Sequence, residues 1–169
     1  MKQLNFTCFR SSFGWVGVVR SLLGISRTVF GKSSEFEVED CLLSGGRMTK
    51  SDEGLAEAVD LLGRYFKGER IAYDLCLDLQ HGTAFQQKVW NVTCRIPYGE
   101  IRTYSWIAAA IGQPHAVRAV GRAQGANRLP IIIPCHRVLR KNGGFGGYSA
   151  GLHWKPKLLA LEHKTQFQA

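Results

Sequence analysis

The first third of the chain alternates apolar and polar positions in short segments separated by turn residues. The segments cover residues 3–9 (QLNFTCF), 14–21 (GWVGVVRS) and 25–30 (ISRTVF). A period of two is typical of half-buried strands, because successive side chains point to opposite faces of a sheet. Glycine and serine between the segments favour tight turns. We therefore expect a small antiparallel meander.

One amphipathic helix is predicted to cover this sheet, within residues 51–69. Its apolar positions recur at helical spacing: Leu55, Val59, Leu62 and Phe66. Ser51 can cap its amino end, and Gly68 can end it. Residues 71–80 (IAYDLCLDLQ) then alternate like a further strand.

The second half of the chain shows mainly helical patterns. Residues 81–96 predict a helix, and residues 154–166 predict another near the carboxyl end. Between them, residues 103–130 contain two short helical patterns separated by the breakers Gly112 and Pro114. This arrangement resembles a helix-turn-helix, although an ordinary helical hairpin gives the same pattern.

Charge is divided unequally along the chain. Residues 1–79 hold ten lysines and arginines against eleven acidic residues, whereas residues 80–169 hold twelve against only Glu100 and Glu162. A surface this basic favours a polyanionic partner such as nucleic acid. The shift predicts two domains, an α/β domain over residues 1–79 and a DNA-binding domain over residues 80–169.

Several function classes are disfavoured by composition. The five cysteines are widely spaced and form no Cys-x-x-Cys pair, so neither a disulfide framework nor a zinc site is expected. No segment is typical of a signal peptide or a membrane span, which favours a soluble cytoplasmic protein. The GGFGG stretch lacks the ending of a phosphate loop, and no dinucleotide motif is present, so no cofactor is expected.

The stretch IIIPCHRV places Cys135 next to His136. The β-branched apolar run before them favours a buried strand, and a lone cysteine in such surroundings is most often a small hydrophobic residue. Residue type alone therefore leaves two interpretations open for this thiol, a nucleophile and a member of the core.

Together with GANRLP before it and GGYSAG after it, this stretch resembles the DNA alkyltransferases that repair O6-alkylguanine, whose hallmark is Pro-Cys-His-Arg-Val. The resemblance runs from about Thr83 through Glu162. With the patterns above it predicts an α+β fold, with a small amino-terminal antiparallel sheet under a helix and a mainly helical, winged-helix-like DNA-binding domain. It implies that the protein flips O6-alkylguanine out of duplex DNA and moves the alkyl group irreversibly to its own cysteine, once per molecule and without a cofactor. O4-alkylthymine is a second candidate substrate.

The resemblance also implies the catalytic residues. Cys135 is the nucleophile, and His136 acts as a base through a bridging water. Glu162 orients that histidine. Asn127 braces the turn at the site, while Tyr104 crowds the backbone phosphate and contacts the base. A cysteine needs such help because a thiol with a pKa of ~8.5 is mostly protonated at neutral pH.

DNA-binding and pocket residues follow from the same resemblance. Arg118 enters the base stack in place of the flipped nucleotide, since a stacked base cannot reach a buried thiol. Tyr104 or Ser149 stabilises the leaving guanine, and the carbonyls of Cys135 and Val138 hold its amino group. The implied DNA-binding residues are Arg118, Tyr104, Ala119, Gly121 and Arg122. The implied pocket residues are Pro130, Val138, Gly146, Tyr148 and Ser149.

Two departures from the family pattern and three rival functions accompany this prediction. Arg122 stands where a human-type member has glycine, and Ala150 stands where glycine often borders the pocket. A lesion sensor of the alkyltransferase-like kind would lack Cys135. A thiol hydrolase is disfavoured because neighbouring residues of a strand point to opposite faces, and because it would leave the basic half of the chain unexplained. A dimeric transcription regulator would need a dimerisation helix, so we expect a monomer that binds double-stranded DNA.

Overall fold

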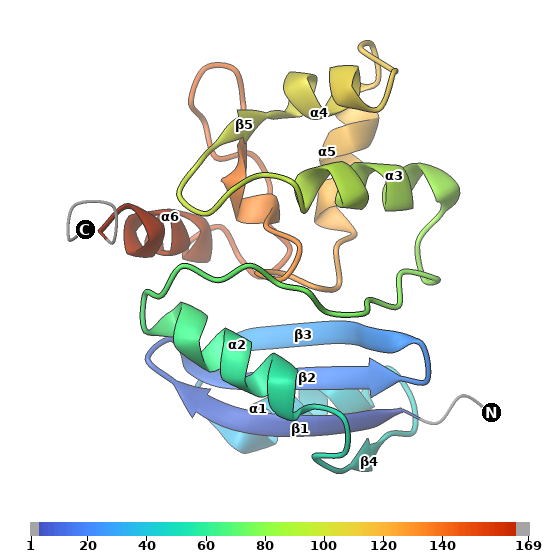
Figure 1. The fold of residues 1–169 in the computed structure, drawn as a ribbon, viewed down its shortest axis with the longest axis vertical. Helices are drawn as coiled ribbons and strands as arrows, with labels where there is room; N and C mark the ends of the chain where they lie inside the picture. Colours follow the sequence, from blue (N-terminus) through green and yellow to red (C-terminus); the bar gives the residue numbers. More distant parts are fainter. Residues whose placement is uncertain (1–3, 165–169) are drawn as a thin grey trace. The chain divides into compact units, whose positions relative to one another are not determined.

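The computed structural model describes residues 4–164 of the chain (Figure 1). Its contacts divide the chain into two compact units, residues 1–79 and residues 80–169. Each unit has its own elements and its own core, and each is described in turn. No helix among the described residues is long and apolar enough to cross a membrane.

The first unit is built on a four-stranded sheet. Strands β1 (Asn5–Ser11), β2 (Gly14–Ser21) and β3 (Gly24–Lys32) form the antiparallel meander that the alternating pattern predicted. The short strand β4 (Thr49–Lys50) pairs parallel with β1, so the sheet order is β3-β2-β1-β4 and the sheet is mixed.

Two helices cover this sheet, where the sequence predicted one. Helix α1 (Glu35–Leu43) packs Val38 and Leu42 against the face that carries Phe6 and Val19. Helix α2 (Ala56–Phe66) lies on the other face, where the ring centroids of Phe66 and Phe30 are 5.9 Å apart. Figure 1 shows α2 in front of the sheet and α1 behind it.

The prediction missed α1 and placed the cap of α2 wrongly. Helix α1 is short and buries few side chains, and Phe36 on it is 75 % exposed, so its apolar positions form no clear stripe. Leu55 is the N-cap residue of α2 and makes no side-chain cap bond, whereas the Ser51 hydroxyl accepts a bond from the Glu53 N–H. Gly68 follows the helix with a φ of +90°, as a terminating glycine does.

The strand predicted in residues 71–80 is wrong. Only Leu77 makes a bridge, to Ile25 of β3. The Ile25 N–H donates to the Cys76 carbonyl and the Asp78 N–H donates to the Ile25 carbonyl, each over 2.8 Å. A side chain at Gly24 would place its Cβ 2.2 Å from the Cys76 oxygen, so this approach requires glycine. The segment therefore touches the sheet at one point, and its alternation does not produce a ladder.

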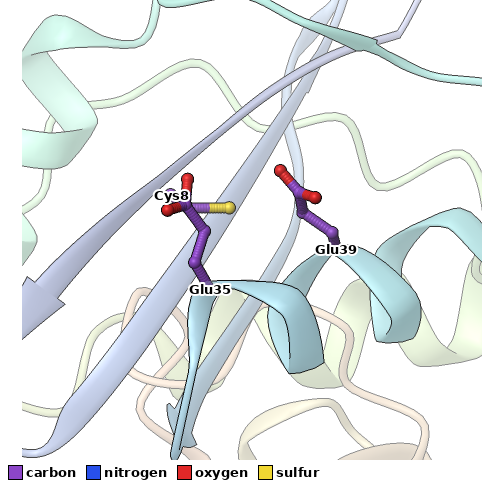
Figure 2. A group of neighbouring side chains, drawn as sticks. All are labelled: Cys8, Glu35 and Glu39. Carbon is purple, nitrogen blue, oxygen red and sulfur yellow. The ribbon is translucent and has the colours of Figure 1, made fainter.

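A compact polar cluster joins β1 to α1 in this unit (Figure 2). The Cys8 thiol and the carboxylates of Glu35 and Glu39 lie within 4.8 Å of one another. The Lys50 ammonium donates to both carboxylates, over 2.6 Å and 2.7 Å, and so supplies the positive charge that the cluster needs. The absence of a structural metal from this unit stays a prediction.

The second unit is mainly helical. Its elements are α3 (Ala84–Thr93), β5 (Arg102–Thr103), α4 (Tyr104–Ala110), α5 (Val117–Gly125), β6 (Val138–Leu139) and α6 (Trp154–Lys164). The four helices confirm the predicted helical segments. Thr83 and Gln86 form a capping box at the start of α3. The Trp90 indole of α3 donates to the Ala123 carbonyl of α5 over 2.9 Å, which ties the two helices together.

Candidate active site

The chain around Cys135 does not form the buried strand that its isoleucines predicted. Ile131 has a φ of +79°, Pro130 and Ile133 bridge to each other, and Cys135–Arg137 forms one 3₁₀ turn. The Asn127 side chain holds this turn in place. Its Oδ1 accepts from the Leu129 N–H over 2.8 Å, and its Nδ2 donates to the Ile133 carbonyl over 3.1 Å.

This geometry changes one argument made from the sequence. The alternation of strand side chains was the reason for disfavouring direct cooperation between Cys135 and His136. Because both residues lie in a 3₁₀ turn, that reason no longer applies. A thiol hydrolase must be weighed on other grounds.

The Cys135 thiol is buried, with 3 % of the residue exposed. Burial raises its pKa to about 11. The Asn127 Nδ2, which lies 3.1 Å from Sγ, acts in the opposite direction, as do the Lys155 charge and the backbone N–H groups. The resting site therefore holds a protonated thiol whose polar surroundings favour the thiolate.

His136 and Glu162 form a fully buried pair beside the thiol. The distance from His136 Nε2 to Glu162 Oε1 is 2.6 Å. Burial would raise the pKa of Glu162, but its bonds to His136 and Arg137 outweigh that effect and hold the pKa well below its ordinary value. Burial lowers the pKa of His136 in spite of this carboxylate. An ionised carboxylate only accepts, so Nε2 carries the proton and Nδ1 carries the lone pair of a base.

Arg137 completes this buried network. Its Nε lies 2.9 Å from Glu162 Oε2, and a second nitrogen donates to the Ile96 carbonyl over 2.7 Å. The Gly99 N–H donates to the same carboxylate over 2.9 Å. The sequence prediction gave Arg137 no role, although its place inside Pro-Cys-His-Arg-Val was an available signal.

Lys155 is a second residue that the prediction missed. It is buried at the start of α6, and its ammonium donates to the Val138 carbonyl over 2.6 Å and to the Phe145 carbonyl. These bonds tie β6 to the middle of the loop that follows it. Burial lowers the pKa of Lys155 to about 8. The Val138 carbonyl, which the resemblance assigned to the guanine amino group, thus already accepts one bond and keeps its second lone pair.

A cavity of about 380 Å³ is formed by the start of α4, by α5 and by the loop after β6. Its lining residues are Tyr104, Val117, Arg118, Gly121, Arg122, Arg140, Gly146 and Gly147. Gly146 has a φ of +65°, and a Cβ there would lie 2.5 Å from the Tyr104 hydroxyl oxygen. Five of the lining residues were predicted from the resemblance; Val117, Arg140 and Gly147 were not.

The other predicted residues lie outside this lining. Ala119 is on α5, half-buried, and Ser149 is exposed. Pro130 and Val138 are buried. The ring centroids of Tyr148 and His136 are 6.4 Å apart in an edge-on arrangement. Burial raises the pKa of the Tyr148 hydroxyl well above the ordinary value. Ala150, one of the two departures from the family pattern, is half-buried.

The chain is similar to known proteins over most of its length. A family model described as the DNA binding domain of 6-O-methylguanine DNA methyltransferase matches residues 84–164. The chain is 49 % identical over 160 residues to a methylated-DNA–protein-cysteine methyltransferase of Methanosarcina acetivorans, covering 94 % of this chain and 98 % of that protein. It is 56 % identical over 100 residues to the constitutive enzyme of that name from Bacillus subtilis, covering 59 % of this chain and 60 % of that protein.

A solved structure of Mycobacterium tuberculosis OGT in complex with DNA has a similar fold. The TM-score is 0.81 at 37 % identity, over 95 % of this chain and 93 % of that chain. The O6-methylguanine-DNA methyltransferase of Pyrococcus kodakaraensis superposes with a TM-score of 0.66 at 26 % identity, over 95 % of this chain and 99 % of that chain. Both superpositions extend over the two units.

Proposed function

The chain belongs to the methylated-DNA–protein-cysteine methyltransferase family, and on this premise we propose that Cys135 is the residue that accepts the alkyl group. The protein is a DNA-repair enzyme that reverses alkylation directly by transfer to its own cysteine. Its substrate is double-stranded DNA that carries O6-alkylguanine, and it acts as a monomer. One observation carries the assignment of Cys135: a buried thiol contacts the Asn127 amide and lies next in sequence to a His–Glu pair.

The reaction needs a thiolate and a place for its proton. The proton passes from Cys135 to Nδ1 of His136 through a bridging water, and the Glu162 carboxylate stabilises the imidazolium that forms. The thiolate then attacks the alkyl carbon and forms a thioether, while the electron pair of the broken carbon–O6 bond stays on the guanine, which takes up one proton in place of the one lost from the thiol. Because a thioether is not hydrolysed at this site, each molecule reacts once.

The leaving guanine gains electron density on O6 as its bond to carbon breaks. A hydrogen-bond donor aimed at this oxygen lowers the barrier. The Tyr104 hydroxyl lies at the cavity wall against Gly146, where it can serve as that donor. Ser149 is the alternative donor and is exposed in the loop after β6.

Access of the base to the thiol requires that the nucleotide leave the duplex. Extrusion costs a few kcal/mol, least for a weakened base pair. Arg118 and Arg122 lie on α5 at the cavity, where the guanidinium of Arg118 can fill the vacated stack and Arg122 can bind the backbone. The small side chains of Ala119 and Gly121 permit a close approach of α5 to the groove.

The test is the mass of the intact protein after incubation with duplex DNA that carries O6-methylguanine. We expect one methyl group per molecule, located by peptide mapping on the fragment that contains Cys135. Unmodified duplex is the control. Methylation at another cysteine, or several turnovers per molecule, would overturn the assignment of Cys135. Peptidase turnover without DNA would instead support a thiol hydrolase, and preference for one undamaged sequence would support a regulator.

A further inference from the structure

Three arginines, Arg118, Arg122 and Arg140, are among the residues that line the cavity beside Tyr104. All three residues are exposed. Within residues 4–164, no salt bridge joins any of them to a carboxylate. The cavity therefore holds positive charge that the described chain does not neutralise.

The composition of residues 80–169 explains why. This half has only two acidic residues, and both are engaged elsewhere. Glu100 pairs with Arg102 over 2.7 Å, and Glu162 is held by His136 and Arg137. No acidic side chain in the described part of this unit is paired with the arginines of the cavity, which leaves them free to bind an anionic ligand.

The three arginines approach the cavity from two walls. Arg118 and Arg122 project from α5, whose N-cap residue Ala116 makes no side-chain cap bond. Arg140 comes from the loop after β6, where its N–H donates to the Gly144 carbonyl over 2.8 Å and its carbonyl accepts from the Gly143 N–H over 2.9 Å. These two bonds hold the backbone at Arg140, so less backbone entropy is lost when its side chain binds an anion.

From this arrangement we propose that Arg140 binds a backbone phosphate of the flipped nucleotide, opposite Arg122. The active site then recognises the phosphates of the nucleotide as well as its base. This rests on the proposed function, because it places a flipped nucleotide in the cavity. A guanidinium fork matches phosphate oxygens in a bidentate manner. The consequence is that a nucleoside phosphate reacts faster than the same nucleoside without phosphate, even outside a duplex.

The experiment compares two small substrates, O6-benzyl-2′-deoxyguanosine and its 3′,5′-bisphosphate, at constant ionic strength. The quantity measured is the ratio of their rates of benzyl transfer to Cys135. In the wild-type protein we expect the bisphosphate to react about tenfold faster, as one charge-assisted bond to phosphate can provide. In Arg140→Ala the ratio should fall to about twofold, and Arg140→Lys should give an intermediate ratio because a point charge replaces the fork.

Arg95→Ala is the matched control, since Arg95 is an exposed arginine of the same unit that does not line the cavity. It should keep the wild-type ratio, so a fall in both variants would indicate a general charge effect and overturn the proposal. A wild-type ratio near one would overturn it, as would an Arg140→Ala protein that slows with both substrates equally. In those cases transfer to Cys135 still occurs, and the proposed function stands. If the wild-type protein accepts benzyl from neither small substrate and methyl from no duplex, the function itself is wrong.

Discussion

Cys8 in the first unit and Cys135 in the second both have a thiol pKa raised to about 11, as does Cys94 in the second unit. Burial is the largest cause at both Cys8 and Cys135. At Cys8 the next causes, the carboxylates of Glu35 and Glu39, raise the pKa further, and only Lys50 opposes them. At Cys135 every other contribution lowers the pKa, from the Asn127 amide to the Lys155 charge and the backbone N–H groups.

The comparison teaches that a resting pKa does not identify a nucleophile. Burial penalises any thiolate, whereas the direction in which the polar neighbours act distinguishes the two sites. Near Cys8, the Lys50 ammonium is already paired with the carboxylates of Glu35 and Glu39. At Cys135 a hydrogen-bond donor and a cation both favour loss of the proton. We therefore expect the two thiols to behave very differently toward an alkyl donor.

The largest effect should come from removing one thiol or the other. Cys135→Ala should abolish alkyl transfer while DNA binding persists, because the thiol is buried and is not among the residues proposed to contact DNA. Cys8→Ala should transfer at close to the wild-type rate. Intact-protein mass after incubation with O6-methylguanine duplex gives the transfer, and a gel-shift assay gives the binding. Transfer that survives in Cys135→Ala and disappears in Cys8→Ala would reverse the comparison.

The next largest effect tests the base. His136→Ala should slow transfer about a hundredfold or more, the usual contribution of a positioned general base. It should do so for O6-methylguanine duplex and for free O6-benzylguanine alike, because the histidine acts on the thiol rather than on DNA. Rates are measured by single-turnover transfer to Cys135 with each substrate.

His136→Gln serves as the control for folding, since glutamine can still donate to the Glu162 carboxylate but is not a base. If His136→Gln reacts as fast as the wild type, His136 supports the structure and does not take the proton. Circular dichroism before each measurement shows whether the variant is folded.

Arg118→Ala should have a smaller effect that appears with only one of the two substrates. On the proposed role of Arg118 in filling the vacated stack, loss of its side chain should slow the duplex reaction by about tenfold, since extrusion costs a few kcal/mol and this residue would offset only part of that cost. Free O6-benzylguanine needs no extrusion, so its rate should change little. Equal slowing of both reactions would mean that Arg118 supports the pocket or the fold.

Much of the fold was predictable from the sequence because its signals are local. The meander shows a period of two interrupted by turn residues, and α3 begins at a capping box. The errors occurred where tertiary structure overrides a local pattern. Residues 71–80 alternate but meet the sheet at a single bridge, and the three isoleucines before Cys135 form a turn that the Asn127 side chain holds.

The residues of the candidate site could be predicted where they belong to a motif of the family that the chain resembles. Cys135, His136 and Asn127 belong to contiguous motifs, so a resemblance can find them. Arg140 and Lys155 stand among other basic residues, and nothing local distinguishes them from solvated charges. Their roles depend on contacts between distant segments, such as the Lys155 bond to the Val138 carbonyl, 17 residues earlier in the chain.

The smallest effect should come from Lys155 and is best seen in a pH profile. The positive charge of Lys155 lowers the pKa of the Cys135 thiol, so Lys155→Met should raise that pKa by about one unit. Alkylation of Cys135 by iodoacetamide should then require a higher pH, with a several-fold lower rate at neutral pH. Because burial lowers the pKa of Lys155 to about 8, below that of the thiol, the wild-type lysine loses its charge as the pH rises past that value, whereas Lys155→Arg keeps it. The arginine variant should therefore react at a lower pH than the methionine variant.

Lys157→Met, which removes an exposed lysine of the same helix, should match the wild type. If Lys155→Met slows alkylation equally at every pH, Lys155 only holds the loop, and its charge does not distinguish Cys135 from Cys8.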